Sequence, residues 1–514
     1  MANSGAQIAT ALANTLTPMC LFLIWIGTII GIIFGSIPGL SATMAVVLFL
    51  PLTFGMETTQ GLALLCGLYM GGISGGLISA ILLKIPGTPS SISTVFDGGP
   101  MAERGEAGRA LGVGILYSAI GSLLGIFALM FVSPLLAKVC LLFSAADYFA
   151  VAVFALSIIA SLSGKDMLNG LIAGLIGIAL SMVGMAPIDA VVRFTFGNYQ
   201  LMSGFDITVL LIGVFAITDI ILSGFDRDHL ADKMEKKKYK LKGYGLSMKE
   251  FIEQIPNAIL SAIIGIGIGI LPGIGGSTAG LLSYTAVRNR SKYPEKFGTG
   301  IIDGVIASEC SNNAVIGGSM IPLLCMGIPG NTVSAIFLGG LQVHTISPGP
   351  LIFNKSGEYV YGIYLALIIS TIFMLVFERL FLPIFVRLLD IPKHILLPCI
   401  VVMCCVGGYS SNSRVFDVQC ILLFGLLGLL FKKLKVPSTP LIIGFIVGSM
   451  FEENLRQALQ AGHGSWTVFL TRPIAMAFLI ITVISCGMTV RKNMMDKKKA
   501  EAAGQDFDTA EEEG

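Results

Sequence analysis

The sequence predicts an all-α polytopic membrane protein made of two homologous halves, and three observations support this fold class. First, 54% of the residues are hydrophobic and 12% are charged, whereas a soluble domain has about 25% charged residues. Second, apolar runs recur along the chain, and at about 20 residues per crossing they predict roughly 11 to 14 membrane segments. Third, the runs are broken by Pro-Gly pairs at matching places in both halves.

Each predicted span is an apolar run with few charged residues. In the first half the runs are Cys20 to Phe34, Leu62 to Leu83, Leu111 to Leu136, Tyr148 to Leu162, Leu168 to Ala186 and Ile207 to Leu222. In the second half they are Ile255 to Leu271, Ile301 to Leu324, Tyr359 to Leu389, Ile395 to Val406, Val418 to Phe431, Leu441 to Phe451 and Pro473 to Val490. The number of crossings depends on how the chain behaves at the Pro-Gly breaks.

Four Pro-Gly pairs form the repeated signal. Pro38-Gly39 matches Pro272-Gly273 at an offset of 234 (272 minus 38), and Pro86-Gly87 matches Pro329-Gly330 at an offset of 243 (329 minus 86). Within a bilayer, backbone groups freed at a break need partners, so such breaks occur where they are buried in protein or line a cavity. Paired breaks of this kind indicate helices that are broken, or hairpins that re-enter the membrane, around a binding site.

The charged segments divide the chain into four parts. We expect transmembrane halves at 1–225 and 254–490, a Lys-rich linker at 226–253 and a charged tail at 491–514. Because cytoplasmic flanks are rich in Lys and Arg, the linker and the tail should face the cytoplasm. No charged side chain precedes Glu57, which favours an N-terminus on the periplasmic side. The halves would then be inverted-topology repeats.

These motifs carry a family resemblance. The repeated Gly-x-Ile/Leu-Pro-Gly-Ile/Leu pattern, the later Ile-Pro-Gly and the stretch Ser308-Glu309-Cys-Ser-Asn312-Asn313-Ala resemble the large membrane subunit of tripartite tricarboxylate transporters, the TctA family. The resemblance extends over about residues 15 to 490. It implies a subunit in the bacterial inner membrane that imports a di- or tricarboxylate with a cation gradient. It also implies two partners, a small four-helix membrane subunit and a periplasmic solute-binding protein.

The first break of each half is a candidate anion site. A helix N-terminus offers free N–H groups and about half a positive charge, and glycine lets a carboxylate approach the backbone because it has no Cβ. We expect the two helix starts to face each other across the repeat interface, with hydroxyl side chains as N-caps. Close helix packing is the alternative explanation for the glycines. The candidates are Gly39, Ser41 and Thr43 in one half, and Gly273, Gly275, Gly276, Ser277 and Thr278 in the other.

The second break adds further candidate ligands of the substrate. Thr88, Ser90, Asn331 and Thr332 supply hydroxyl and amide oxygens, which would also suit sodium, a hard cation. Lys84, just before the break, either meets a substrate carboxylate or extends to water as an interfacial lysine.

Three polar residues of the run Ile301 to Leu324 are candidates for the coupling ion, Na⁺ or H⁺. Glu309 lies three or four residues before Asn312 and Asn313, and so on the same face of a helix. Buried amides are costly unless they are bonded. These residues are therefore either ligands of the ion or partners that join neighbouring helices.

The remaining residues argue against other classes of protein. The ten cysteines show no Cys-x-x-Cys spacing and are predicted to be core residues, with neither disulfides nor a zinc site. No Gly-x-x-x-x-Gly-Lys motif occurs, so ATP-driven pumping is not indicated, and no cofactor and no enzymatic activity are expected. A stand-alone ion-coupled carboxylate carrier without a binding protein remains the alternative. We expect a solvated loop to hold Asp97, Glu103, Arg104, Glu106 and Arg109.

Overall fold

The computed structural model describes residues 4–162, 167–225, 245–388 and 393–502. Most of the linker predicted at 226–253 and the end of the predicted tail lie outside these residues. The described chain is helical apart from one two-stranded antiparallel sheet, in which β1 (Gly184–Met185) pairs with β2 (Val192–Arg193). This agrees with the predicted all-α membrane protein.

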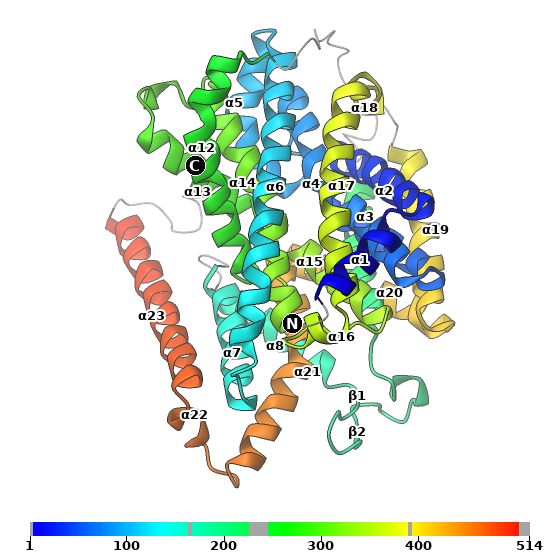
Figure 1. Cartoon of the computed structure of the whole chain (residues 1–514). Helices are drawn as coiled ribbons and strands as arrows, with labels where there is room; N and C mark the ends of the chain where they lie inside the picture. The colour runs from blue at the N-terminus through cyan, green and yellow to red at the C-terminus, as the bar shows by residue number, and fades with distance from the viewer. Residues whose placement is uncertain (1–3, 163–166, 226–244, 389–392, 503–514) are drawn as a thin grey trace. The chain divides into compact units, whose positions relative to one another are not determined.

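The chain folds into two compact units, and each unit contains segments of both predicted halves. Unit 1 is Met1–Leu141 with Asp206–Leu430, and unit 2 is Leu142–Phe205 with Phe431–Gly514. Figure 1 labels the helices and strands of both.

Unit 1 contains every candidate site residue. Its elements up to residue 225 are α1 (Ser4–Thr15), α2 (Pro18–Ser36), α3 (Ala42–Phe49), η1 (Leu50–Gly55), α4 (Thr58–Leu83), η2 (Pro89–Ser91), α5 (Ile92–Glu103), α6 (Ala107–Cys140), α9 (Ile207–Leu211), the π-helical η5 (Ile212–Ile217) and α10 (Thr218–Phe225). The later elements are α12 (Met248–Ile270), α13 (Gly275–Arg290), η6 (Pro294–Lys296), α14 (Ile302–Met326), α15 (Thr332–Val343), α16 (Ile352–Lys355), α17 (Gly357–Leu380), α18 (Leu382–Leu388), α19 (Lys393–Asn412) and α20 (Val415–Lys433).

Unit 2 is built on contacts of α21 with α7 and α8 and of α23 with α7. Its elements are α7 (Ala145–Leu162), α8 (Met167–Ser181), β1, β2, η4 (Tyr199–Leu201), α21 (Ser438–Ala461), α22 (Val468–Thr471) and α23 (Pro473–Ala502). Ion pairs join the segment between α8 and α9 to α21. Arg193 and Arg456 both contact Glu452, and Arg456 also bonds Asp189 at 2.8 Å. That bond lowers the pKa of the Asp189 carboxyl.

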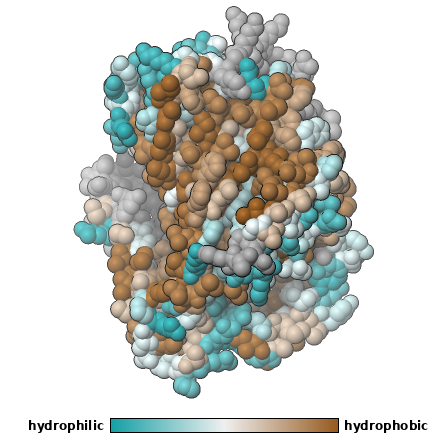
Figure 2. All heavy atoms as spheres, in the orientation of Figure 1, coloured by the Kyte–Doolittle hydropathy of each residue, from teal (hydrophilic) through white to brown (hydrophobic). Residues whose placement is uncertain are grey.

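Six helices of the described chain are long and apolar enough to cross a membrane, namely α2, α4, α6, α12, α17 and α20. Shorter apolar helices accompany them. Apolar side chains cover much of the face seen in Figure 2, and α12 exposes a row that includes Ile255, Ile259 and Ile263. A solvent-facing helix would carry polar residues at such positions, so this surface is suited to lipid.

The helix α14 contrasts with these spans, because residues 304 to 325 are all buried. It carries Glu309, Ser311, Asn312 and Asn313, which are unsuited to lipid contact. Contacts with α4, α5, α6, α12, α13 and α15 surround it. The predicted run Ile301 to Leu324 is therefore an internal helix of unit 1, enclosed by protein.

Glycine allows the close packing next to the breaks. The helix α2 packs on α4, and a Cβ added at Gly31, Gly35 or Gly71 would collide with the backbone of the other helix. In the same way, a Cβ at Gly265 or Gly269 of α12 would collide with α14. Close helix packing therefore explains these glycines, which precede the Pro-Gly pairs and are not among the candidate site residues.

The local backbone at the second breaks repeats at the sequence offset. Lys84 and Gly327 each follow a long helix in the left-handed conformation, with φ of 57° and 73°. Four residues later, Thr88 and Asn331 are both extended ahead of the next helical turn. Lysine rarely adopts a positive φ, so residue 84 takes the conformation that its glycine counterpart adopts without strain.

The expectation of a solvated loop is wrong for Asp97, whereas Glu103 and Arg104 are exposed and Glu106 and Arg109 are half-exposed. Asp97 lies within α5 and is fully buried. Its carboxylate accepts the backbone N–H groups of Gly298, Gly300 and Ile301 at 2.7–3.0 Å and the Tyr284 hydroxyl at 2.9 Å. Asp97 therefore fastens α5 to the connection between α13 and α14.

We predict that Asp97→Ala destabilises the protein by roughly 3 kcal/mol or more, because several buried donors lose a charged acceptor at once. The loss should appear as a lower thermal midpoint of the detergent-purified protein. Glu106→Ala is the matched control, since Glu106 is partly exposed and pairs with Arg104 at 3.4 Å at the surface. Equal midpoints for the two variants would contradict this account of Asp97.

Candidate functional site

The four breaks pack crosswise in unit 1. The helix α3, after Pro38-Gly39, packs against α15, which follows Pro329-Gly330. The helix α13, after Pro272-Gly273, packs against η2 and α5, which follow Pro86-Gly87. The first break of each half is thus next to the second break of the other. We expected the starts of α3 and α13 to face each other; the contacts that each makes with a break of the opposite half are those of α3 with α15 and of α13 with η2 and α5.

The first break of the first half is a capped helix start. Ser41 is the N-cap of α3, and its hydroxyl accepts the N–H of Met44 at 3.1 Å, as predicted. Gly39 has a φ of 90° and is exposed, and Thr43 is half-buried. The positive φ explains why glycine occupies position 39.

The corresponding start of α13 has no side-chain cap. Gly273 and Gly275 have φ of 78° and 75°, and the Gly273 N–H donates to the carbonyl of Gly330 at 2.9 Å. Ser277 and Thr278 lie inside the first turn, and Thr278 donates to the carbonyl of Ile274 at 3.5 Å. The prediction that these hydroxyls cap the helix is therefore wrong, because two glycines, not a capping side chain, shape the turn.

The middle of α14 meets this helix start at Asn312. A Cβ on Gly276 would contact the Asn312 amide oxygen and the Cβ of Ser90. Neither atom of the Asn312 amide has a hydrogen-bond partner, although the residue is 1% exposed. Buried amides normally have partners, and leaving one without any costs about 1–3 kcal/mol. The Asn312 amide therefore lies beside Gly276 and Ser90 with its hydrogen-bonding capacity unused.

The second break of the first half forms a hydroxyl cluster. Thr88 and Ser90 are buried, and the Thr88 hydroxyl lies 3.0 Å from that of Ser90 and 2.9 Å from that of Ser91. Lys84 does not point into this cluster. Its ammonium pairs with Glu103 at 2.5 Å, and its stem lies over Gly99 of α5.

The second break of the second half is an asparagine-capped helix start. Asn331 caps α15 by accepting the N–H of Ser334 at 2.8 Å. Its amide also donates to the hydroxyl of Tyr69 at 2.7 Å, and that hydroxyl lies 2.9 Å from Ser319. Thr332, the first residue of α15, is half-buried. Tyr69 of α4 thereby joins the first half to this start.

The predicted coupling-ion residues form a second polar group on α14. The Glu309 carboxylate accepts the hydroxyls of Thr94 at 2.5 Å and Ser118 at 3.0 Å. The Asn313 amide donates to the Glu309 carbonyl at 3.0 Å, and its own oxygen has no partner. Glu309 is fully buried. The group draws on α5, α6 and α14.

Sequence reasoning missed four residues of this core. Tyr69, Thr94 and Ser118 lie in helices whose sequence pattern gives no sign that these three residues have a functional role. Glu378 is the fourth, a buried acid in the apolar helix α17. An acidic residue inside an apolar span is a signal in itself, and it could have identified Glu378.

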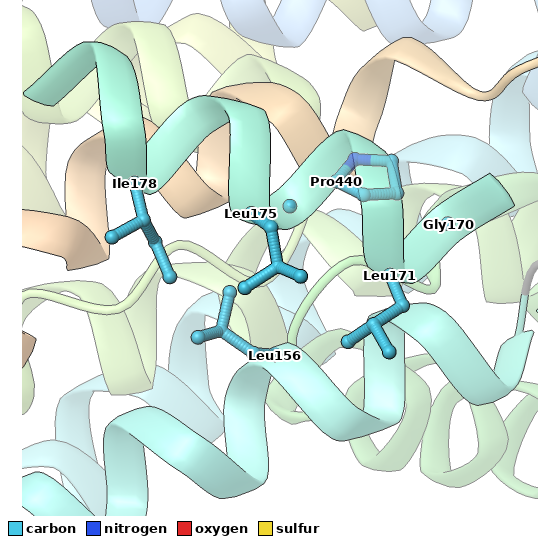
Figure 3. Close-up of a pocket in the computed structure, with 7 residues that line it drawn as sticks. Leu156, Gly170, Leu171, Leu175, Ile178 and Pro440 are labelled. Carbon is cyan, nitrogen blue, oxygen red and sulfur yellow. The ribbon is translucent and has the colours of Figure 1, made fainter. Parts of the chain in front are cut away.

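Two hollows lie away from the candidate residues. In unit 2, a cavity of about 20 Å³ is lined by side chains that include Leu156, Leu171 and Pro440, shown in Figure 3. It is apolar and holds at most about one water molecule. In unit 1, an open hollow of about 650 Å³ is lined by residues that include Glu57 and Tyr359. Neither hollow includes a predicted site residue.

The described residues contain no group of three or more His, Cys, Asp or Glu side chains that could hold a metal ion. The polar groups on and around α14 offer oxygen atoms from hydroxyls, amides and one carboxylate. Hard monovalent cations and protons bind to oxygen atoms of these kinds.

We predict that Tyr69→Phe destabilises the protein by about 1–3 kcal/mol, because the buried Asn331 amide loses its acceptor. The thermal midpoint of the purified protein measures the effect. Tyr359→Phe is the control, since Tyr359 lies at the open hollow and its ring would keep its surroundings. An unchanged midpoint for Tyr69→Phe would show that this contact does not hold α15.

Comparison with known proteins identifies the family. The model of the tripartite tricarboxylate transporter TctA family matches residues 21–443. A protein of Agrobacterium vitis described as "Uncharacterized 52.8 kDa protein in TAR-I ttuC' 3'region" is 34% identical over 478 residues, 93% of this chain and 94% of the relative. A second A. vitis protein, "Uncharacterized protein in TAR-II ttuC' 3'region", is 34% identical over 231 residues, 45% of this chain and 96% of that protein.

No solved structure matches the chain. The matched family is a transporter component, the large one of tripartite systems, and not an enzyme family. With a match over most of its length, the chain belongs to the tripartite tricarboxylate transporter TctA family.

Proposed function

We propose that the protein is the permease subunit of a binding-protein-dependent secondary transporter that imports a di- or tricarboxylate with a cation gradient. Its partners would be a small four-helix membrane subunit and a periplasmic solute-binding protein, in the bacterial inner membrane. The observation that carries the proposal is the buried, unpartnered amide of Asn312 beside Gly276 and Ser90, where a break of one half packs on a break of the other.

An anionic substrate would bind at the starts of the broken helices. The start of α13 has no side-chain cap, so its first N–H groups remain available to a carboxylate,. Gly275 has open space where a Cβ would stand, which lets a ligand approach the backbone. Ser277 and the hydroxyls of Thr88 and Ser90 would add neutral donors. Such a site attracts an anion without holding it by a fixed salt bridge, which allows release.

The start of α3 would serve a second carboxylate or the same one in another state. Gly39 is exposed there, and the Ser41 hydroxyl already caps the helix. The groups of this helix start that could contact a substrate are therefore its backbone and the Thr43 side chain. Asn331 and Thr332 lie on the adjoining start of α15, where Asn331 is engaged by Tyr69. The two crosswise pairs are chemically different, so we assign the stronger anion site to α13.

The coupling cation would bind at Glu309, Asn312 and Asn313. The free oxygens of Asn312 and Asn313 supply neutral ligands, and Glu309 supplies a charge. Because Asn312 lies beside Gly276 and next to Asn313 in the chain, a cation there would raise the affinity for an anion at α13. Lys84 is engaged with Glu103, so we assign it a role only if that ion pair opens during transport.

We further propose that the halves are inverted repeats and that transport is by alternating access, with the crosswise breaks moving as one element. The repeated backbone at Lys84 and Gly327 supports duplication. The Lys-rich linker and the C-terminal tail would lie in the cytoplasm and the N-terminus in the periplasm.

The direct test is uptake of radiolabelled di- and tricarboxylates by proteoliposomes that hold this chain and its four-helix partner. Uptake should require both the binding protein and an imposed sodium or proton gradient. Full uptake without the binding protein would make the chain a stand-alone carrier. Absence of carboxylate uptake with all components and gradients present would reject the proposal.

We predict that Gly276→Ala lowers carboxylate uptake at least tenfold with unchanged membrane insertion, because the added methyl group occupies the space between Asn312 and Ser90. Gly267→Ala on α12 is the matched control, since a Cβ there meets nothing within 4 Å. It should transport as the wild type does. Wild-type uptake by Gly276→Ala would remove Gly276 from the site.

We predict that Asn312→Leu raises the cation concentration for half-maximal uptake at least tenfold, a loss of about 1.4 kcal/mol of binding free energy. The thermal midpoint without cation should be unchanged or higher, because an unpartnered polar group is replaced by an apolar one of similar size. An unchanged cation requirement would leave Asn312 as a packing residue.

A further inference from the structure

A second buried acid of unit 1 lies outside the site described above. Glu378 is near the end of α17 and is fully buried. One of its carboxyl oxygens accepts the hydroxyl of Ser74, on α4, at 2.9 Å. The other oxygen is buried and has no hydrogen-bond partner. The Ser74 hydroxyl is thus the one hydrogen-bond partner of this carboxyl group among the described residues.

Another buried acid of unit 1, Glu309, lies in the same core as Glu378. A Cβ at Gly114 of α6 would stand 3.7 Å from Glu309 and 3.7 Å from Leu77, which is one turn of α4 from Ser74, so both acids belong to the core in which α4 contacts α6, α14 and α17. Among the described residues, Glu309 accepts the hydroxyls of Thr94 and Ser118 and, at 3.4 Å, the side-chain amide of Asn313, whereas Glu378 accepts the hydroxyl of Ser74 alone. Two negative charges buried in one core repel each other, which favours protonation of one of the two carboxyl groups.

No described cationic side chain forms an ion pair with Glu378. The elements packed against α17 are α1, α2, α4, α6, α16 and α18. The titratable and charged groups described on them, with the residues that flank α4, are Cys20, Glu57, Cys66, Tyr69, Lys84, Arg109, Tyr117, Lys138, Cys140 and Lys355; α17 itself adds Glu358, Tyr359, Tyr361, Tyr364 and Arg379. Lys84 is paired with Glu103 and Arg109 with Glu250.

This environment selects the species that Glu378 can bind. An isolated carboxylate in such a core costs several kcal/mol. A sodium ion would need several oxygen ligands, and one hydroxyl is too few. A proton needs no further ligand, because a protonated carboxyl is neutral and still accepts the Ser74 hydroxyl.

We propose that Glu378 is a proton-binding site that is coupled electrostatically to Glu309. The chain then has two ion sites in one core: the Glu309 group, which our proposed function assigns to the coupling ion, and a separate proton on Glu378. Neutralising Glu309, by a cation or a proton, removes the repulsion and lets Glu378 release its proton more readily. The role in transport rests on the proposed function, whereas proton binding does not.

Infrared difference spectroscopy of the purified full chain tests proton binding without any substrate. Spectra taken at alkaline and acid pH should show the C=O band of a carboxylic acid that gains a proton. Glu378→Gln should remove this band, and Ser74→Ala should shift its frequency because the hydroxyl no longer donates. Glu103→Gln, at an exposed ion pair, should leave the band unchanged.

The coupling is tested in the same experiment with Glu309→Gln. The midpoint at which the Glu378 band appears should move to more acid pH, because a neighbouring negative charge is gone. A band that persists in Glu378→Gln, or one that is present at every pH in the wild type, would overturn the proposal. If Glu378→Gln fails to fold, the frequency shift in Ser74→Ala decides it, and an unshifted band would overturn it.

Uptake measurements separate this inference from the proposed function. In proteoliposomes, Glu378→Gln should flatten the pH profile of carboxylate uptake while the cation requirement of the Glu309 group remains. If the wild type shows the infrared band but no carboxylate uptake, the proposed function fails and the proton site stands. If uptake and its pH profile are unchanged in Glu378→Gln, Glu378 has no part in coupling.

Discussion

The enclosure of α14 is the constraint on which the rest of unit 1 depends. The helix carries a carboxyl group and two amides that lipid would not tolerate, so protein must surround it on every side. Glycines make this possible, because α12 approaches α14 through Gly265 and Gly269, and α6 approaches it through Gly121 and Gly125. A side chain at these positions would separate the helices and admit lipid or water to the polar groups.

The breaks depend on the same enclosure. Backbone groups freed where a helix stops need partners inside the protein, and the structure supplies partners both from the other break of the same half and from the opposite half. The Gly273 N–H bonds Gly330, and Asn331 bonds Tyr69. Several buried polar atoms remain without a partner, and those of the Asn312 amide and the Asn313 oxygen lie on α14. These atoms lie where the crosswise-packed breaks meet the internal helix.

The electrostatics of this core differ from those of an ordinary ion-pair network. Among the described residues of unit 1, the ion pairs of Lys84 with Glu103 and of Arg109 with Glu250 lie at exposed or half-exposed positions, and the buried Asp417 pairs with Arg414. Glu309 and Glu378 have hydroxyl groups in place of cations. A carboxyl held in this way can exchange a proton or a small cation, because no fixed positive charge competes for it. This distinguishes a site that must load and unload from one that only stabilises a fold.

The membrane class and the position of every break follow from the sequence, because hydropathy and Pro-Gly pairs are local properties of the chain. The offset of 243 residues (327 minus 84) also relates Lys84 to Gly327, and these two residues share a left-handed backbone conformation. The tertiary structure alone decided which break packs on which, that Ser277 and Thr278 cap nothing, that Asp97 is buried and that Glu378 shares a core with Glu309. These facts depend on contacts between residues far apart in the chain, and no local pattern encodes which buried polar atoms will find partners there.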